Sequence, residues 1–275
     1  MVFAYSTDSP MPSTTEEFQS KFQEKVKSFG DITHPVWSGG SGQPIILMHE
    51  LDGFIPAFMK LALRLGEAFT VHTPVFYGRV GQSFSGLTGY MRAYFCMRRE
   101  FQVFRLGRTS PIAGWVRSLA QEIHHQSDAQ GVGVVGMCMT GGIVLATISH
   151  PSVAVGVAAQ PSLPLASFGS LRRKEDLGMY ADDVQAAAIS DTPVMIMRYG
   201  KDKICPAERM PSIERQIPTA QRPPGSLEMQ LSKTASHPTL TDAFRKDTDA
   251  AVQDISELAV DQTINFLSEH LRSKP

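Results

Sequence analysis

Short apolar runs alternate along the chain with longer segments in which apolar residues recur at helical spacing. The spacing predicts helices over residues 14–28, 55–67, 111–126, 140–149, 177–190, 206–216 and 252–271. The apolar runs predict strands over residues 34–37, 44–49, 70–75, 132–135, 153–159, 194–199 and 226–231. Strands that are apolar on both faces and alternate with helices indicate an α/β protein, with a mostly parallel central sheet flanked by helices on both faces.

Two parts of the chain need a separate interpretation. Ser13 and Glu16 have the spacing of a capping box, and the next apolar residues are four apart: Phe18, Phe22 and Val26. We therefore expect residues 1–30 to form an N-terminal extension that contains a helix. Residues 76–110 do not follow the alternation, which predicts a cap-like insertion over the carboxyl edge of the sheet. No linker divides the remainder, so residues 31–275 are expected to form one domain.

Composition excludes several classes of protein. The chain has 275 residues, 42% of them hydrophobic, and a formal net charge of −1, so dominant disorder is excluded. No basic excess is available to neutralise phosphates, and we expect no nucleic-acid partner. Residues 129–171 contain no charged side chain, but scattered Gly and Pro interrupt them, so we expect no membrane span.

The cysteines indicate a cellular compartment. Cys96, Cys138 and Cys205 are odd in number and lack the C-x-x-C spacing, which argues against a disulfide framework or a metal site. Residues 2–5 are too short for the apolar core of a signal peptide. We therefore expect a cytoplasmic protein, a monomer or small homo-oligomer, with no metal and no organic cofactor.

The most informative segment is residues 131–142. A predicted strand leads into the sequence G-x-C-x-T, and Gly-Gly follows at the start of a predicted helix. This order matches a nucleophile elbow with Cys138 in the serine position. Such a nucleophile occupies a strained turn, so its neighbours two residues away must be small; Gly136 meets this requirement better than Thr140. The following helix directs its N-terminal dipole at the turn, which favours a thiolate. The alternative interpretation is a buried cysteine that packs as a small hydrophobe.

A cysteine nucleophile needs a base, and the base needs a group that orients it. In this arrangement the order along the chain is nucleophile, acid, histidine. Asp202 follows the strand predicted at 194–199, and His237 follows the last predicted strand, so they are our candidates for acid and base. The alternatives are a turn residue or helix cap for Asp202 and an ordinary loop residue for His237.

Several motifs together resemble the dienelactone hydrolase family of α/β-hydrolases over about residues 31–272. In family order they are M-H-E-L-D-G-F at 48–54, V-F-Y-G-R at 75–79, G-M-C-M-T-G-G at 136–142, Y-G-K-D-K-I-C-P at 199–206 and S-H-P at 236–238. The resemblance implies an α/β-hydrolase fold and a catalytic triad of Cys138, Asp202 and His237. It also implies that Glu50 lies near the nucleophile and helps control its ionisation, with a surface carboxylate as the alternative.

The resemblance further assigns the oxyanion-hole donors to the backbone N–H groups of Leu51 and Met139. The sequence departs from the family pattern at Thr140, where glycine is usual, and at Thr241, where dienelactone hydrolases carry an arginine that holds a substrate carboxylate. The stretch Q-P-S-L-P at 160–164 is a further departure. These differences argue against the specific dienelactone activity.

The region from Phe76 to Arg117 holds seven arginines, one acid and several aromatic residues. One hypothesis is a cap whose arginines attract an anionic or aromatic ester, with Arg79, Arg98 and Arg99 binding substrate. The other is a solvated face whose arginines pair with acids elsewhere, such as Glu175, Asp182 or Asp183.

The sequence therefore predicts a hydrolase of small esters or lactones that works through an acyl-thioester on Cys138. Its partner would be a small-molecule ester or lactone substrate. A different interpretation stays open, because the same fold also serves non-catalytic ligand-binding or thiol-sensing proteins. Acyl transfer to an acceptor other than water is a third.

Overall fold

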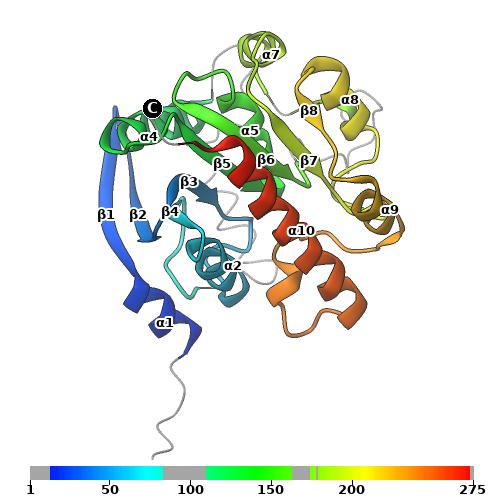
Figure 1. Ribbon diagram of the computed structural model, residues 1–275, viewed down its shortest axis with the longest axis horizontal. Helices are drawn as coiled ribbons and strands as arrows, with labels where there is room; N and C mark the ends of the chain where they lie inside the picture. The colour runs from blue at the N-terminus through cyan, green and yellow to red at the C-terminus, as the bar shows by residue number, and fades with distance from the viewer. Residues whose placement is uncertain (1–12, 83–109, 163–173, 178, 273–275) are drawn as a thin grey trace, which may run out of the picture.

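The computed structural model describes residues 13–82, 110–162, 174–177 and 179–272, which form one central sheet with helices on both faces. Among these residues the strands lie in the order β1-β2-β4-β3-β5-β6-β7-β8 (Figure 1). They are β1 (Phe22–Phe29), β2 (Ile32–Gly40), β3 (Gln43–Met48), β4 (Phe69–Pro74), β5 (Val132–Met137), β6 (Val153–Ala159), β7 (Val194–Met197) and β8 (Ala220–Gln221). β2 pairs antiparallel with both β1 and β4, and the other neighbours are parallel. The predicted α/β class is confirmed.

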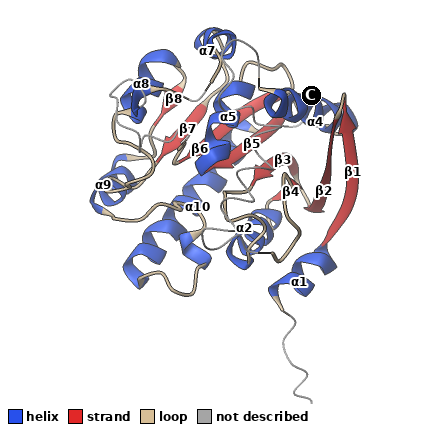
Figure 2. Cartoon of the chain, turned by 180° about the vertical axis from the view of Figure 1, so that it is seen from behind, coloured by secondary structure: helices blue, strands red, loops and turns tan. Residues whose placement is uncertain are grey.

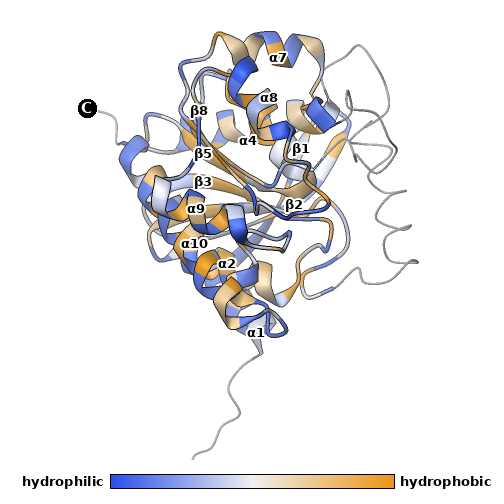
Figure 3. Ribbon diagram, turned by 90° about the vertical axis from the view of Figure 1, so that its right-hand side faces the viewer, coloured by the Kyte–Doolittle hydropathy of each residue, from blue (hydrophilic) through white to orange (hydrophobic). Residues whose placement is uncertain are grey.

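The helices divide between the two faces of the sheet, as the edge-on view in Figure 3 shows. α4 (Pro111–Gln126), α5 (Gly141–Thr147), α7 (Ala181–Ala188) and α8 (Arg209–Gln216) cover one face. α1 (Thr14–Lys21), α2 (Pro56–Gly66), α9 (Gly225–Lys233) and α10 (Ala250–His270) cover the other. None of the helices in the described part of the chain is long and apolar enough to cross a membrane.

Alternation within the strands builds a hydrophobic core on each face. In β3, Ile46 and Met48 pack toward α4 and α5, while Ile45 and Leu47 pack toward α2 and α10. All four are fully buried, because helices cover both faces. This double burial explains why the parallel strands are uninterrupted apolar runs in the sequence.

The parallel strands also bring the functional candidates to one edge of the sheet. β3, β5, β6 and β7 run in the same direction, so their carboxyl ends lie at a common edge. The residues that follow these ends include Glu50, Cys138, Gln160 and Asp202. In open α/β sheets this edge is where ligands bind.

The predicted helix over residues 14–28 is wrong beyond Lys21. Its capping box is present, with the Ser13 N–H donating to Glu16 Oε2 at 2.7 Å and the Glu16 N–H donating to Ser13 Oγ at 3.3 Å. Residues 22–29 instead form the edge strand β1, seen beside β2 in Figure 2. Of the three apolar residues spaced by four, the first two are buried and Val26 is 65% exposed, so no helical apolar face continues.

The strand predicted over residues 226–231 is also wrong, because this segment lies in α9. Leu227 and Leu231 are four residues apart and both are buried on one helical face, the spacing of an amphipathic helix. The last strand, β8, has only two residues and was not predicted from the sequence. The other predicted helices and strands are confirmed, with shifts of a few residues at their ends.

Candidate active site

Cys138 lies at the tip of a tight turn between β5 and α5. It has a φ of +53°, in the left-handed region that non-glycine residues rarely adopt. Gly136 permits this turn, because a Cβ on it would lie 2.5 Å from the carbonyl oxygen of Thr140 and 2.7 Å from a methyl group of Val144. Cys138 keeps 9% of its surface exposed. The turn has the backbone form of a nucleophile elbow.

Thr140 fits inside the elbow despite being larger than glycine. It is fully buried, and its hydroxyl accepts a hydrogen bond from the Met137 N–H at 2.8 Å. The same hydroxyl donates to the carbonyl oxygen of Met137 at 2.9 Å. The side chain therefore closes the turn instead of disrupting it.

Asp202 and His237 are in direct contact at the carboxyl edge of the sheet. His237 Nδ1 lies 2.7 Å from Asp202 Oδ2, and since a carboxylate only accepts, Nδ1 carries the proton. Asp202 Oδ1 accepts from the backbone N–H groups of Ile204, at 2.7 Å, and Cys205, at 3.0 Å. These bonds fix the carboxylate so that it holds the imidazole in one orientation.

The other imidazole nitrogen, Nε2, is buried and has no hydrogen-bond partner of normal geometry among the described residues. Burial disfavours the charged imidazole, but the hydrogen bond to Asp202 and the interaction with the Cys138 thiol outweigh burial and raise the pKa of His237 to about 10. The sequence candidates Cys138, Asp202 and His237 are therefore together, with Asp202 on one side of the ring and Cys138 close enough to affect its charge.

Glu50 is buried two residues beyond β3, and its carboxyl group contacts two polar side chains. Thr241 Oγ1 hydrogen-bonds to Oε1, and Gln160 Nε2 donates to Oε2 at 3.3 Å. Burial raises the pKa of Glu50, against the opposing effects of Arg245, Thr241 and His237. Thr241, which stands where dienelactone hydrolases carry an arginine, thus hydrogen-bonds to the Glu50 carboxyl.

The loop around Glu50 is fixed through its backbone. The Glu50 carbonyl oxygen accepts from Tyr77 Oη at 2.7 Å and from His49 Nδ1 at 2.8 Å, while His49 Nε2 accepts from the Phe76 N–H at 3.1 Å. His49 is therefore neutral, and burial lowers its pKa to about 4. No described residue accepts a hydrogen bond from the N–H of Leu51.

Sequence reasoning assigned no role to His49, Tyr77 or Gln160, although all three belong to the motifs or departures it singled out. Met139 directly follows the elbow cysteine and is buried, with its sulfur 3.9 Å from Tyr77 Oη. Tyr77 therefore touches both segments that carry the oxyanion-hole candidates.

Of the three arginines predicted to bind substrate, the structure describes Arg79. Arg79 is exposed on the loop after β4, and Arg98 and Arg99, with most of residues 76–110, lie outside the described residues. Arg117 pairs with Asp183 and with the carbonyl oxygen of Ala146. For Arg117 the alternative of pairing with a distant acid is confirmed.

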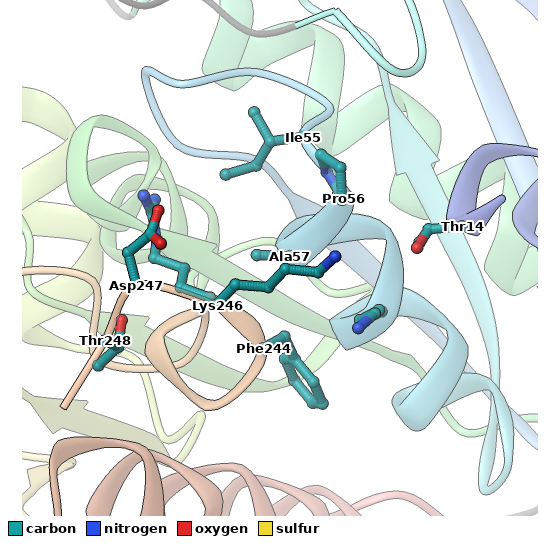
Figure 4. A pocket seen from close by; sticks show the side chains of 10 residues that line it. Thr14, Ile55, Pro56, Ala57, Phe244, Lys246, Asp247 and Thr248 are labelled. Carbon is teal, nitrogen blue, oxygen red and sulfur yellow. The ribbon is translucent and has the colours of Figure 1, made fainter. Parts of the chain in front are cut away.

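A cavity of about 570 Å³ lies between the starts of α1 and α2 and residues 244–248 (Figure 4). Cys138, Asp202 and His237 do not line it. Arg245 does, and its Nη2 lies 2.6 Å from Asp52 Oδ2 and 3.9 Å from Glu50 Oε1. Within the described residues, no three His, Cys, Asp or Glu side chains are grouped to hold a metal ion.

A fixed acid–imidazole pair beside an elbow cysteine at the carboxyl edge is an arrangement suited to acyl chemistry. The family model for dienelactone hydrolases matches residues 30–271. The chain belongs to the dienelactone hydrolase family. This family is one of hydrolases, so membership identifies an ester or lactone hydrolase at the level of the family. None of the curated proteins matches the sequence.

Solved structures of dienelactone hydrolase-like proteins share the fold. A protein from Klebsiella pneumoniae described as a dienelactone hydrolase is 16% identical, with a TM-score of 0.57, over 90% of this chain and 98% of its own. A protein from Acinetobacter baumannii described as a lipase is 14% identical, with a TM-score of 0.57, over 96% and 98%. An esterase from Pyrococcus furiosus is 12% identical, with a TM-score of 0.53, over 92% and 94%.

Proposed function

We propose that the protein hydrolyses small esters or lactones, with Cys138 as nucleophile, His237 as base and Asp202 as the group that orients His237. The observation that carries this proposal is the 2.7 Å contact between Asp202 and His237 Nδ1, which leaves the Nε2 side of the ring for the thiol of Cys138. A base needs this tautomer to accept a proton at Nε2.

Before the substrate is attacked, proton transfer from the Cys138 thiol to His237 Nε2 forms a thiolate–imidazolium pair. A pKa of about 10 for His237 makes the imidazolium its form at neutral pH, and Asp202 stabilises that charge. The resulting thiolate adds to the substrate carbonyl carbon. The backbone N–H groups of Leu51 and Met139 donate to the oxyanion that forms on the carbonyl oxygen.

Collapse of this intermediate breaks the bond to the leaving alkoxide, which takes the proton from His237. The acyl group then remains on Cys138 as a thioester. His237 next removes a proton from water, whose oxygen attacks the thioester carbonyl. The intermediate collapses to the carboxylic acid and the Cys138 thiolate beside the imidazolium of His237, which restores the starting state.

A thiolate is itself a good leaving group, so the first intermediate also collapses back to substrate. Net turnover therefore favours substrates whose own leaving groups are good, such as enol esters. Neither step requires a metal ion or an organic cofactor. A dienelactone substrate carries a carboxylate, and position 241 has a threonine in place of the arginine that would bind this carboxylate.

The test compares hydrolysis of p-nitrophenyl acetate by wild type and Cys138→Ala, with Cys205→Ala as the matched control. Cys205 is also buried beside the site, and burial raises its pKa to about 12. We expect Cys138→Ala to lose at least about 10³-fold in kcat/KM, and Cys205→Ala to retain most activity. Equal rates in wild type and Cys138→Ala would contradict the proposal and favour ligand binding or thiol sensing.

A further inference from the structure

Gln160, the first residue after β6, has a conformation that the surrounding structure must hold in place. Its φ is +34°, in the left-handed region, and it is fully buried. Its backbone N–H donates to the carbonyl oxygen of Met197 at 2.7 Å, and its own carbonyl oxygen accepts from Ser162 Oγ at 2.6 Å. Strained backbone of this kind persists only where the surrounding structure holds it, and it clusters at active sites.

The side-chain amide of Gln160 joins two parts of the site. Oε1 accepts from the backbone N–H of Thr239 at 3.3 Å, and Nε2 donates to Glu50 Oε2 at 3.3 Å. A backbone N–H can only donate, so the oxygen of the amide must face Thr239 and the nitrogen must face Glu50. Thr239 lies two residues after His237, so one amide connects the Glu50 carboxyl to the histidine loop.

This orientation restricts where Glu50 can carry a proton. An amide nitrogen does not accept hydrogen bonds, so Oε2 must remain an acceptor. The neutral acid therefore has its proton on Oε1, facing the hydroxyl of Thr241, which can accept as well as donate. The charged or titratable groups that act on Glu50 are Arg245, His237 and Asp52, and the buried phenol of Tyr199 also senses its charge.

We propose that Gln160 is a positioning residue whose amide holds the Glu50 carboxyl against the histidine loop and keeps its exchangeable proton on Oε1, against Thr241. The charge of Glu50 interacts with His237. By holding the Glu50 carboxyl, Gln160 therefore influences the pH at which Glu50 gains or loses the charge that His237 experiences. This proposal rests on the proposed function only in assuming that His237 and Cys138 are catalytic.

The test is a pH titration of the infrared carbonyl band of protonated Glu50, identified by its loss in Glu50→Gln. In Gln160→Met the ionised carboxylate loses a donor, and we expect the midpoint to rise by about one pH unit. Ser162→Ala is the matched control, because Ser162 contacts the backbone of Gln160 and not Glu50. We expect its midpoint to equal that of wild type.

Gln160→Gly is the second variant, because glycine adopts a positive φ without strain and removes the same amide. It should shift the midpoint in the same direction while remaining folded. A purely structural role would lower the melting temperature of Gln160→Met and leave the Glu50 midpoint unmoved in both variants, and that result would overturn the proposal.

The second readout is the rate of Cys138 alkylation by iodoacetamide against pH. We expect Gln160→Met to shift this profile in the Glu50 protein and to leave it unchanged in the Glu50→Gln background. A shift of equal size in both backgrounds would also overturn the proposal. Failure of the proposed function would instead appear as hydrolysis that survives Cys138→Ala, and it would leave the Glu50 titration informative.

Discussion

The hydroxyl of Thr140 and the backbone of Met137 exchange two hydrogen bonds, one to the N–H at 2.8 Å and one to the carbonyl oxygen at 2.9 Å. Both partners are fully buried, so water cannot replace either bond. Thr140 thereby stabilises the elbow through two side-chain hydrogen bonds that a glycine at this position could not make. The larger residue is accommodated because its side chain points into the turn.

Thr140→Val keeps the shape of the side chain and removes the hydroxyl. We expect a loss of about 1–3 kcal/mol in the free energy of unfolding, because the buried N–H of Met137 is left without a partner. Thr140→Ser, the matched control, keeps the hydroxyl and should lose less. Urea unfolding of both variants measures the difference, and equal losses would contradict the assigned hydrogen bonds.

Gly136→Ala tests the steric requirement of the elbow. The new Cβ would lie 2.5 Å from a backbone oxygen, so we expect a loss of about 1–3 kcal/mol in stability and slower alkylation of Cys138. Gly114→Ala in α4 is the control, because no atom lies within 4 Å of its added Cβ. That variant should gain about 0.5–1 kcal/mol. A harmless Gly136→Ala would mean that the turn is looser than described.

The Asp202–His237 pair predicts a specific dependence of stability on pH. The pKa of His237 is raised from 6.5 to about 10 in the folded protein, so its stabilising contribution is complete below about pH 6.5 and is lost as the pH rises toward 10. Asp202→Asn should flatten this alkaline decline, measured by urea unfolding at several pH values. Asp261→Asn removes an exposed carboxylate paired with Arg64 and should leave the slope unchanged.

The elbow and its partners could be predicted because local rules act there. Gly136 and Cys138 occupy positions that steric requirements of a strand–turn–helix dictate, and Asp202, after β7, and His237, after α9, come in the expected order along the chain. The roles of Cys138, Asp202, His237 and Glu50, and of the N–H groups of Leu51 and Met139, remain predictions.

Other features depend on contacts between distant residues. Residues 22–29 form a strand because they pair with β2, which no local pattern reveals. Glu50 contacts Gln160 and Thr241, which are 110 and 191 residues away in the sequence. Only the folded chain brings these three side chains together, so the sequence presented Gln160 and Thr241 as departures from a family pattern and not as a network.

The central claim is that Cys138 carries the acyl group during turnover. The most direct test is rapid quenching of the reaction with p-nitrophenyl acetate in His237→Ala, which should slow removal of the acyl group, followed by peptide mass spectrometry. We predict an acetyl group on the peptide that contains Cys138 and none on the peptide that contains Cys205. Turnover by wild type with no acetyl group on Cys138 in either protein would contradict the claim.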